Sequence, residues 1–389
     1  VITSNIPNSI DDFNVVKGNP VDILNVLGAG DAFMSGFLRG YLRGESLEKS
    51  ANYANASGAL VVSRHGCAPA IPGENELLYY IENAANIPDP TSDITLNHLH
   101  RVSFRSKEEQ EIFGFAFDHR KQLADLAEMY GEGLSKITEL KKLFIRSVEN
   151  TIEKLNIPEK NIGVLIDDTY GEDALNSIAE KAWWIGRPVE LPGSRPLKFE
   201  GQQSIGSKLQ SWPLSHIVKC LFYYHPDDSD ELKIKQEQKV KELYFACIQS
   251  GHQLLLEVIP PSEYEMDEEI IPTVLKRFYD LEIKPDWWKL PALKDKSWVQ
   301  VSDVINSYDP HCQGVLLLGL SAPIDTVRES FSVAAKYNIC KGFTVGRTIF
   351  YEPAKLWMQH KISDQELVDS VSTNYNELIQ SWKKYKEEI

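Results

Sequence analysis

The sequence predicts an α/β protein in which a (β/α)8 barrel follows a smaller α/β segment. Beyond about residue 100, eight short apolar runs alternate with charged, helix-patterned segments. Runs that are apolar throughout are typical of parallel strands covered on both faces, and eight of them fit a closed barrel. The 389 residues also exceed one average domain, so two domains are expected. An open, doubly wound sheet is the alternative, because short runs alone do not establish closure.

The first domain is expected over residues 1–85. Short β-type runs at 13–26 surround a Gly-Asn-Pro turn and predict a hairpin. The turn Gly28-Ala29-Gly30-Asp31 follows and leads into an amphipathic helix. Glycines let backbone N–H groups converge on an anion at a helix N-terminus, and the carboxylate of Asp31 can accept a proton from an attacking hydroxyl. For these four residues alone, a helix-capping turn is the simpler interpretation.

A longer stretch of the first domain carries a family resemblance. NVLGAGDAFMSGFLRGYLRG at 25–44 and ANYANASGALVVSRHGCAPAIP at 51–72 resemble the C-terminal part of ribokinase-like (pfkB) sugar kinases. The resemblance covers about residues 10–80 and is strongest to the 5-dehydro-2-deoxygluconokinases of inositol catabolism. It implies that Asp31 is the catalytic base and that Gly28, Ala29 and Gly30 form the anion hole. It also implies ATP and Mg²⁺ as cofactors of a complete kinase.

The position of this motif departs from the family pattern. In the kinases it follows a large α/β domain with the sugar site and most of the nucleotide site, whereas here it begins at residue 28. The chain also opens with Val1. We therefore expect an N-terminally truncated kinase remnant that does not catalyse phosphoryl transfer on this chain.

The second domain is expected over residues 106–389, after a linker at 86–105. The stretch AANIPDPTSDITLNH around the start of the linker holds two prolines and several polar turn formers. The predicted strands of the barrel are the apolar runs at 112–119, 162–168, 187–193, 216–224, 252–260, 284–292, 314–322 and 342–350.

The ends of these runs carry ionisable side chains. Catalytic groups of a (β/α)8 barrel lie at the carboxyl ends of its strands. Lysine inside an apolar strand is rare unless paired, and desolvation favours the neutral amine that attacks a carbonyl carbon. A structural Lys–Glu or Lys–Asp pair is the alternative for either lysine, but several such groups at one mouth favour catalysis. The groups are Asp118, His119, Arg120, Asp167, Asp168, Lys219, Glu257, Lys289, Ser321, Gly346 and Arg347.

The same runs carry a second resemblance. FAFDHR, VKCLFYYHPDD, LLLEVIPP, DWWKLPA and GLSAPIDTVRESFSVAAKYN…KGFTVGRTIFYEPAKLW resemble, in this order, class I aldolases of the tagatose-bisphosphate aldolase type. More directly, residues 100–385 resemble the aldolase-like domain found fused to 5-dehydro-2-deoxygluconokinases. The resemblance implies a Schiff-base lysine at Lys289, a second lysine at Lys219, and acids at Glu257 and Asp118. It further implies a phosphate site built from backbone N–H groups and an arginine, at Ser321, Ala322, Gly346 and Arg347.

Two features depart from this second family. Trp287 and Trp288 stand where the relatives carry smaller aliphatic residues, and we expect both to form a desolvated wall beside Lys289. The stretch PVELPGSRP at 188–196 adds a glutamate and Arg195, which either bind a substrate carboxylate or cap a loop. A zinc-dependent aldolase is a weak alternative, since the histidines are scattered, so no metal site is expected.

The two resemblances together predict a reaction. The kinase family makes 2-deoxy-5-keto-gluconate 6-phosphate, and the next step of myo-inositol catabolism cleaves it to dihydroxyacetone phosphate and malonate semialdehyde. The fusion therefore predicts a Schiff-base aldolase for this step. Two alternatives stay open: another barrel lyase or isomerase acting on a phosphosugar, and a non-catalytic barrel that binds a metabolite and regulates or scaffolds the kinase.

Composition limits the partners and the compartment. The net charge of −15 argues against nucleic acid and anionic membrane surfaces as partners. No apolar run approaches the ~20 residues that span a bilayer. The five cysteines are scattered without CxxC spacing, which favours reduced thiols and a cytoplasmic location. We expect a small phosphosugar as partner and no cofactor for the barrel, and self-association into a homo-oligomer is left open.

Overall fold

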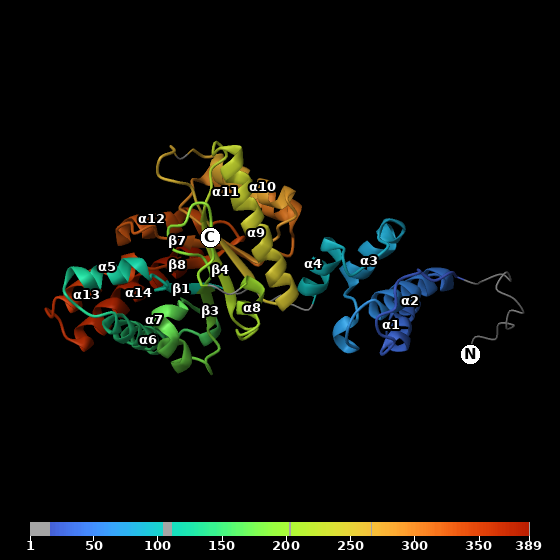
Figure 1. The fold of residues 1–389 in the computed structure, drawn as a ribbon, viewed down its shortest axis with the longest axis horizontal. Helices are drawn as coiled ribbons and strands as arrows, with labels where there is room; N and C mark the ends of the chain where they lie inside the picture. Colours follow the sequence, from blue (N-terminus) through green and yellow to red (C-terminus); the bar gives the residue numbers. More distant parts are fainter. Residues whose placement is uncertain (1–15, 104–110, 202–203, 266, 389) are drawn as a thin grey trace, which may run out of the picture. The chain divides into compact units, whose positions relative to one another are not determined.

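The chain forms two compact units, residues 1–107 and 108–389 (Figure 1). The structure is a computed structural model, and it describes residues 16–103, 111–201, 204–265 and 267–388.

The described part of the first unit is built from helices. They are α1 (Ala29–Leu42), α2 (Leu47–Val62), α3 (Glu74–Asn83) and α4 (Ile94–Ser103), with 3-10 turns η1 (Ala68–Ala70) and η2 (Ala84–Asn86). Helices α1 and α2 pack very closely because α1 presents glycine at the contact. A Cβ on Gly36 would lie 2.5 Å from the carbonyl oxygen of Tyr53, and one on Gly40 would lie 2.5 Å from Ser50 Oγ.

A buried ion cluster joins three helices of the first unit. The Glu76 carboxylate of α3 is fully buried. It pairs with Arg64, just after α2, and its Oε2 lies 3.0 Å from Nδ1 of His100 on α4. A buried carboxylate is tolerated only when it is paired, so these partners keep the three helices together.

The hairpin predicted over 13–26 does not form in its described part. Residues 16–26 contain no strand, and residues 13–15 lie outside the described residues. The backbone N–H groups of Leu24 and Asn25 instead donate to the carbonyl oxygen of Val62 at the end of α2 (2.8 and 3.1 Å). An isolated hairpin has little stability without further strands, so the segment bonds to a helix end.

The predicted linker at 86–105 also contains regular structure. Its second half is helix α4, which packs against α3 and buries Leu96 and Val102. The polar turn formers that suggested a linker lie before this helix, where Asp93 Oδ1 accepts from the backbone N–H of Leu96 (2.8 Å).

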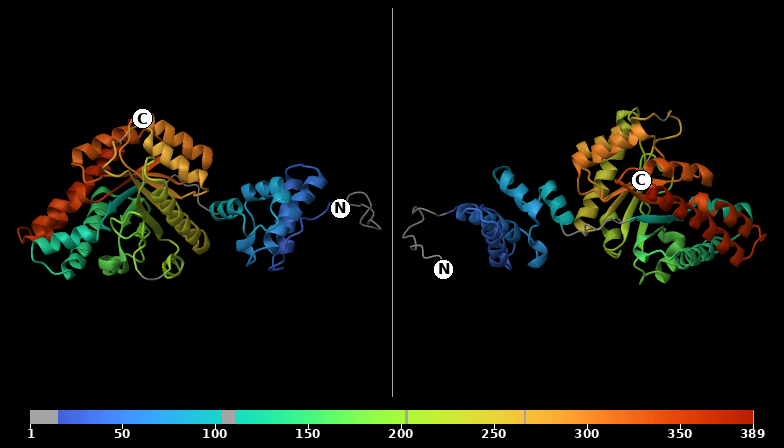
Figure 2. Two further views of the ribbon diagram at one scale, coloured as in Figure 1. Left: turned by 45° about the horizontal axis from the view of Figure 1, so that its top comes forward. Right: turned by 180° about the vertical axis from the view of Figure 1, so that it is seen from behind.

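The predicted (β/α)8 barrel is confirmed. Eight parallel strands pair in sequence order, and β1 also pairs with β8, so the sheet is closed and the open-sheet alternative is wrong (Figures 1 and 2). The strands are β1 (Ile112–Ala116), β2 (Ile162–Leu165), β3 (Trp184–Pro188), β4 (Ile217–Tyr223), β5 (Leu254–Ile259), β6 (Trp287–Leu290), β7 (Gly314–Leu318) and β8 (Cys340–Val345).

The third strand lies earlier than predicted. The expected run was 187–193, whereas β3 ends at Pro188. Beyond it, the backbone N–H of Val189 still donates to the carbonyl oxygen of Lys219 (3.0 Å), and the chain then leaves the sheet through an isolated antiparallel bridge between Glu190 and Phe199.

Helices cover the outside of the barrel. They are α5 (Lys121–Met129), α6 (Ser135–Leu155), α7 (Asp168–Ser177), α8 (Ile205–Leu209), α9 (Asp230–Ser250), α10 (Ile270–Asp280), α11 (Asp295–Tyr308), α12 (Ile324–Ala334), α13 (Arg347–Met358) and α14 (Asp364–Glu387), with a 3-10 turn η3 (Glu159–Asn161). No helix among the described residues combines the length and the apolarity needed to cross a membrane.

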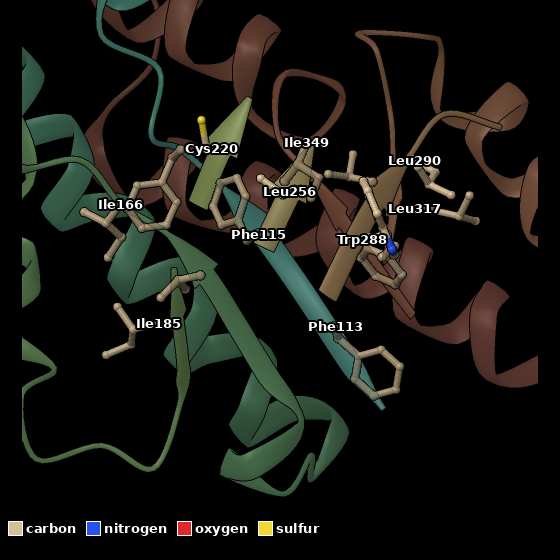
Figure 3. Packing of buried hydrophobic residues seen from close by; sticks show 14 of the residues in the cluster. Phe113, Phe115, Ile166, Ile185, Cys220, Leu256, Trp288, Leu290, Leu317 and Ile349 are labelled. Carbon is tan, nitrogen blue, oxygen red and sulfur yellow. The ribbon is translucent and has the colours of Figure 1, made fainter. Parts of the chain in front are cut away.

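Strand alternation sorts the side chains into two cores. Outward residues such as Phe115 and Trp288 pack under the helices (Figure 3). Inward residues form a separate apolar floor inside the barrel, made of Ile112, Ala116, Leu165, Trp184, Ile217, Leu255, Trp287 and Leu316. Because strand side chains alternate with a period of two, the next inward positions toward the carboxyl ends carry the site.

Candidate active site

A cavity of about 540 Å³ opens at the carboxyl ends of the strands. Lys219, Glu257 and Lys289 line it, each two residues after a floor residue of its own strand. Its other charged or polar lining includes Asp118, His119, Arg120, Gln122, Glu190, Tyr223, Ser262, Ser321, Thr344 and Arg347. The predicted barrel groups Asp118, Lys219, Glu257, Lys289, Ser321, Gly346 and Arg347 therefore share one mouth.

Three carboxylates surround the amine of Lys219. Its Nζ lies 3.1 Å from Asp118 Oδ2, 2.8 Å from Glu190 Oε1 and 3.0 Å from Glu257 Oε2. Burial by itself would lower the pKa of Lys219, but the attraction of the three carboxylates outweighs it and holds this pKa well above the usual value. Lys219 is therefore a fixed cation across the physiological pH range.

Glu257 connects the two lysines. Its Oε1 lies 3.1 Å from Lys289 Nζ, while its Oε2 faces Lys219. Burial favours the neutral acid, yet the charges of Lys219 and Lys289 outweigh that effect and lower the pKa of Glu257. Among the described residues, Glu257 is the one carboxylate that pairs with Lys289.

The end of β1 supplies an acid and a neutral imidazole. Burial opposes ionisation of Asp118, but the nearby charge of Lys219 dominates and keeps its pKa well below the usual range. Burial lowers the pKa of His119 to about 3, and the charge of Arg347 adds to this effect. The His119 ring is therefore neutral at physiological pH, although its Nδ1 lies 3.9 Å from Asp118.

Glu190 belongs to the site although the resemblance gave it no role. Its Oε1 accepts from Lys219 (2.8 Å) and from Arg120 Nη2 (3.3 Å), and Arg120 Nη1 binds Glu200 at 2.6 Å. The side chain is buried. The sequence did contain a signal for Glu190, because it is an acidic residue in the otherwise apolar stretch PVELP. The signal could not be used because the predicted strand continued past this residue to 193.

The two tryptophans beside Lys289 point to opposite faces of β6. Trp287 is part of the floor, and its ring packs edge-on against that of Trp184 with 5.8 Å between the ring centroids. Trp288 points outward, where its Nε1 donates to the hydroxyl of Tyr279 on α10 (2.9 Å). The expectation that both form a wall beside Lys289 is therefore wrong for Trp288, because neighbouring strand residues alternate faces.

The last two strands end in the predicted phosphate site. Leu320 and Ser321 both have left-handed backbones, with φ of 46° and 61°. A Cβ on Gly346 would lie 2.4 Å from the carbonyl oxygen of Ala116, so only glycine lets β8 approach β1 here. The N–H of Ala322 already donates to the carbonyl of Gly319 (2.8 Å), which leaves it unavailable to a ligand.

Arg347 follows the carboxyl end of β8. It begins α13 and lines the cavity. Among the residues that the structure describes, no carboxylate pairs with it, whereas Arg120 is held by Glu190 and Glu200.

Other predicted groups lie elsewhere. Arg195 pairs with Asp228 and Glu263 and is not part of the cavity lining, so it ties loops together instead of facing the mouth. Asp167 is fully buried against Lys141 of α6, and Asp168 pairs with Arg187 (2.7 Å). Over the described residues, no group of three or more His, Cys, Asp or Glu side chains is arranged to hold a metal ion.

The glycine turn of the first unit caps a helix. Gly28 has a left-handed φ of 84° and precedes α1, and a Cβ there would lie 2.6 Å from Cys67 Sγ. Asp31 is exposed in the first turn of α1, together with Gly30, while Ala29 is half-buried. The roles that the resemblance implies for these four residues stay predictions.

Comparison with known families separates the two parts. The family described as "Uncharacterized protein conserved in bacteria (DUF2090)" matches residues 76–386. The chain belongs to the DUF2090 family. The pfkB carbohydrate kinase family matches residues 8–73, ahead of the DUF2090 region. The kinase resemblance of the N-terminal segment is thereby confirmed.

Several curated relatives match the kinase-like segment. The 5-dehydro-2-deoxygluconokinase of Listeria monocytogenes is 37% identical over 68 residues, which are 18% of this chain and 21% of that enzyme. The enzyme of the same name from Bacillus subtilis is 37% identical over 60 residues, 15% of this chain and 18% of its own. This DUF2090 chain therefore spans about a fifth of the length of these kinases.

A solved structure resembles the DUF2090 chain at low similarity. A crystal structure of a protein from Corynebacterium glutamicum has 14% identity and a TM-score of 0.45, and the match covers 79% of this chain and 99% of that one.

Proposed function

We propose that the DUF2090 barrel is a Schiff-base aldolase that cleaves 2-deoxy-5-keto-gluconate 6-phosphate to dihydroxyacetone phosphate and malonate semialdehyde. The observation that carries the proposal is a pair of buried lysines sharing one carboxylate, Glu257, at a barrel mouth. The kinase-like segment at 8–73 supports this substrate, because the kinase family of the sequence resemblance produces it.

The contacts of the two lysines suggest different roles. Lys219 is held as a cation by three carboxylates, whereas Lys289 shares Glu257 alone among the described carboxylates. A nucleophilic lysine must lose its proton, and one carboxylate holds the amine of Lys289 whereas three hold that of Lys219. Lys289 is therefore the proposed nucleophile, and Lys219 is the cation that holds the carboxylates in place.

The reaction can then be written for these groups. The neutral Lys289 amine attacks the ketone, and loss of water gives a protonated imine. Glu257, relayed through Lys219 or Asp118, takes the proton of the hydroxyl two carbons away, and that carbon becomes the aldehyde as the C–C bond breaks. The bond electrons pass to the imine nitrogen and give an enamine, which is protonated and hydrolysed by water to release dihydroxyacetone phosphate. This chemistry uses no added cofactor.

The decisive experiment follows product and adduct together. The purified chain would be incubated with 2-deoxy-5-keto-gluconate 6-phosphate while dihydroxyacetone phosphate is measured, and then reduced with borohydride. We expect product release and one reduced adduct per chain in intact-mass spectra. Release without an adduct would favour a phosphosugar lyase that forms no Schiff base, and an isomerised substrate without release would favour an isomerase.

A second candidate is a non-catalytic metabolite-binding barrel that regulates the kinase. The closed ion network favours it, because Asp118, Glu190 and Glu257 are all paired already. Saturable binding of the same phosphosugar with neither product nor adduct would select this function.

Arg347 is expected to hold the phosphate. Arg347→Ala should weaken phosphorylated ligands by about 1.5–3 kcal/mol, the scale of a charge-assisted hydrogen bond. Calorimetric titration with dihydroxyacetone phosphate and with unphosphorylated dihydroxyacetone would measure this. An equal loss for both ligands would mean that the phosphate is bound elsewhere.

The kinase-like segment is expected to be catalytically silent on this chain. Asp31 is exposed in the first turn of α1, in a segment that matches about a fifth of a curated kinase. We expect no ATP-dependent phosphorylation of 5-dehydro-2-deoxygluconate by the purified chain. Phosphorylation that Asp31→Asn abolishes would contradict this expectation.

A further inference from the structure

A second cavity adjoins the mouth on its β7–β8 side. It has a volume of about 670 Å³ and lies among α5, the loop before α12, and α13. Gln122, Ser321 and Arg347 line both cavities, so the two spaces meet at the free guanidinium of Arg347.

The wall of the second cavity is largely apolar. Leu126 and Met129 of α5, Ile324 of α12, and Tyr351 and Pro353 of α13 contribute to it. Met129 is 68% exposed and Tyr351 is 36% exposed. Apolar surface left open to water is unfavourable for the protein alone, so this wall gains most from covering by a ligand.

The charges around the cavity favour a ligand with a single anionic group. Arg347 has no carboxylate partner among the described residues. The acidic side chains at the edge, Asp125 and Glu352, are neutralised by Lys121 (2.9 Å) and Lys355 (3.5 Å) on their own helices. The unpaired guanidinium of Arg347 therefore provides for one anionic group, and the rest of the wall offers no unpaired cation among the described lining residues.

We infer that the second cavity binds the apolar, aromatic part of an organic phosphate monoester whose phosphate pairs with Arg347. The inference rests on the proposed function at one point, namely that Arg347 binds a phosphate group. Since a substrate phosphate needs the same guanidinium, such a ligand and the phosphosugar exclude each other. The barrel thereby has a place for a competitive aryl phosphate that never contacts Lys289.

Phenyl phosphate and inorganic phosphate provide the test, with the full chain in calorimetric titrations at one ionic strength. Phenyl phosphate is expected to bind at least tenfold more tightly than inorganic phosphate, and dihydroxyacetone phosphate should displace it. Ile324→Trp, which narrows the cavity, and Tyr351→Ala, which removes its aromatic ring, should each cut the phenyl phosphate advantage to less than threefold while inorganic phosphate binding stays unchanged.

The controls separate this site from the catalytic proposal. Leu356→Trp adds the same bulk on α13 at a position that is 36% exposed and outside the cavity lining, and it should change neither ligand. Arg347→Ala should weaken both ligands at least tenfold. Equal affinity for the two phosphates, an advantage that survives both cavity variants, or unchanged binding of both phosphates by the Arg347→Ala chain would overturn the inference. Absence of a borohydride adduct would overturn the aldolase proposal without altering these titrations.

Discussion

Lys289→Met is expected to abolish both turnover and the borohydride-trapped adduct of the DUF2090 barrel. The side chain is buried at the mouth, directly above the floor residue Trp287, and its amine contacts Glu257 at 3.1 Å. Methionine fills similar space without an amine, so the imine cannot form. A loss of at least 10⁴-fold in rate would be consistent with removal of a covalent step, measured as dihydroxyacetone phosphate release.

Lys219→Met is the matched comparison for this experiment. It also removes a buried amine, but it leaves Asp118, Glu190 and Glu257 without their shared cation. We expect slower turnover with the adduct still formed on Lys289. An adduct found on Lys219 in the unmodified chain would reverse the two roles, and an adduct on neither would rule out the Schiff base.

Lys141→Met is expected to cost about 3–5 kcal/mol of the barrel's unfolding free energy, the scale for breaking a buried ion pair from one side. Lys141 is fully buried on α6, pairs with Asp167, and has its Nζ 3.4 Å from the carbonyl oxygen of His119. Its loss would leave the Asp167 carboxylate buried without a cation. Urea unfolding followed by circular dichroism would measure the change.

The adjacent residue supplies the control. Lys142 pairs with Asp173, and both side chains are about half exposed, at 52% and 53%. Lys142→Met should change the unfolding free energy by less than about 1 kcal/mol, as for other exposed pairs. If the two variants lost the same stability, the buried pair would contribute no more to folding than the exposed one.

The barrel was predictable because its signal is local. Each strand needs an apolar run that is buried on both faces, and seven runs lie within a few residues of their strands. The third run was misplaced because PVELP looks apolar, while Pro188 in fact ends β3. The hairpin at 13–26 failed because its backbone groups bond to the end of α2, a tertiary contact that no local pattern contains.

The site was predictable where strand periodicity alone decides orientation. Lys219, Glu257 and Lys289 face inward because each lies two residues after a floor residue. Periodicity would equally have separated Trp287 from Trp288. Arg195 could not be placed, since its partners Asp228 and Glu263 come from two other loops. Glu190 was missed because the predicted third strand ran to residue 193, whereas β3 ends at Pro188 and Glu190 follows it at the mouth.

The buried Glu76 cluster has a practical consequence for anyone who shortens this chain. The two family matches meet between residues 73 and 76, which invites a cut there to obtain the DUF2090 region alone. Such a cut would discard Arg64 while retaining Glu76 and His100, and a carboxylate that is fully buried would lose its strongest cation. The boundary of the compact units at 107 and 108 removes all three residues together. Sequence families and physical units of folding thus end at different places, and a truncation should follow the second.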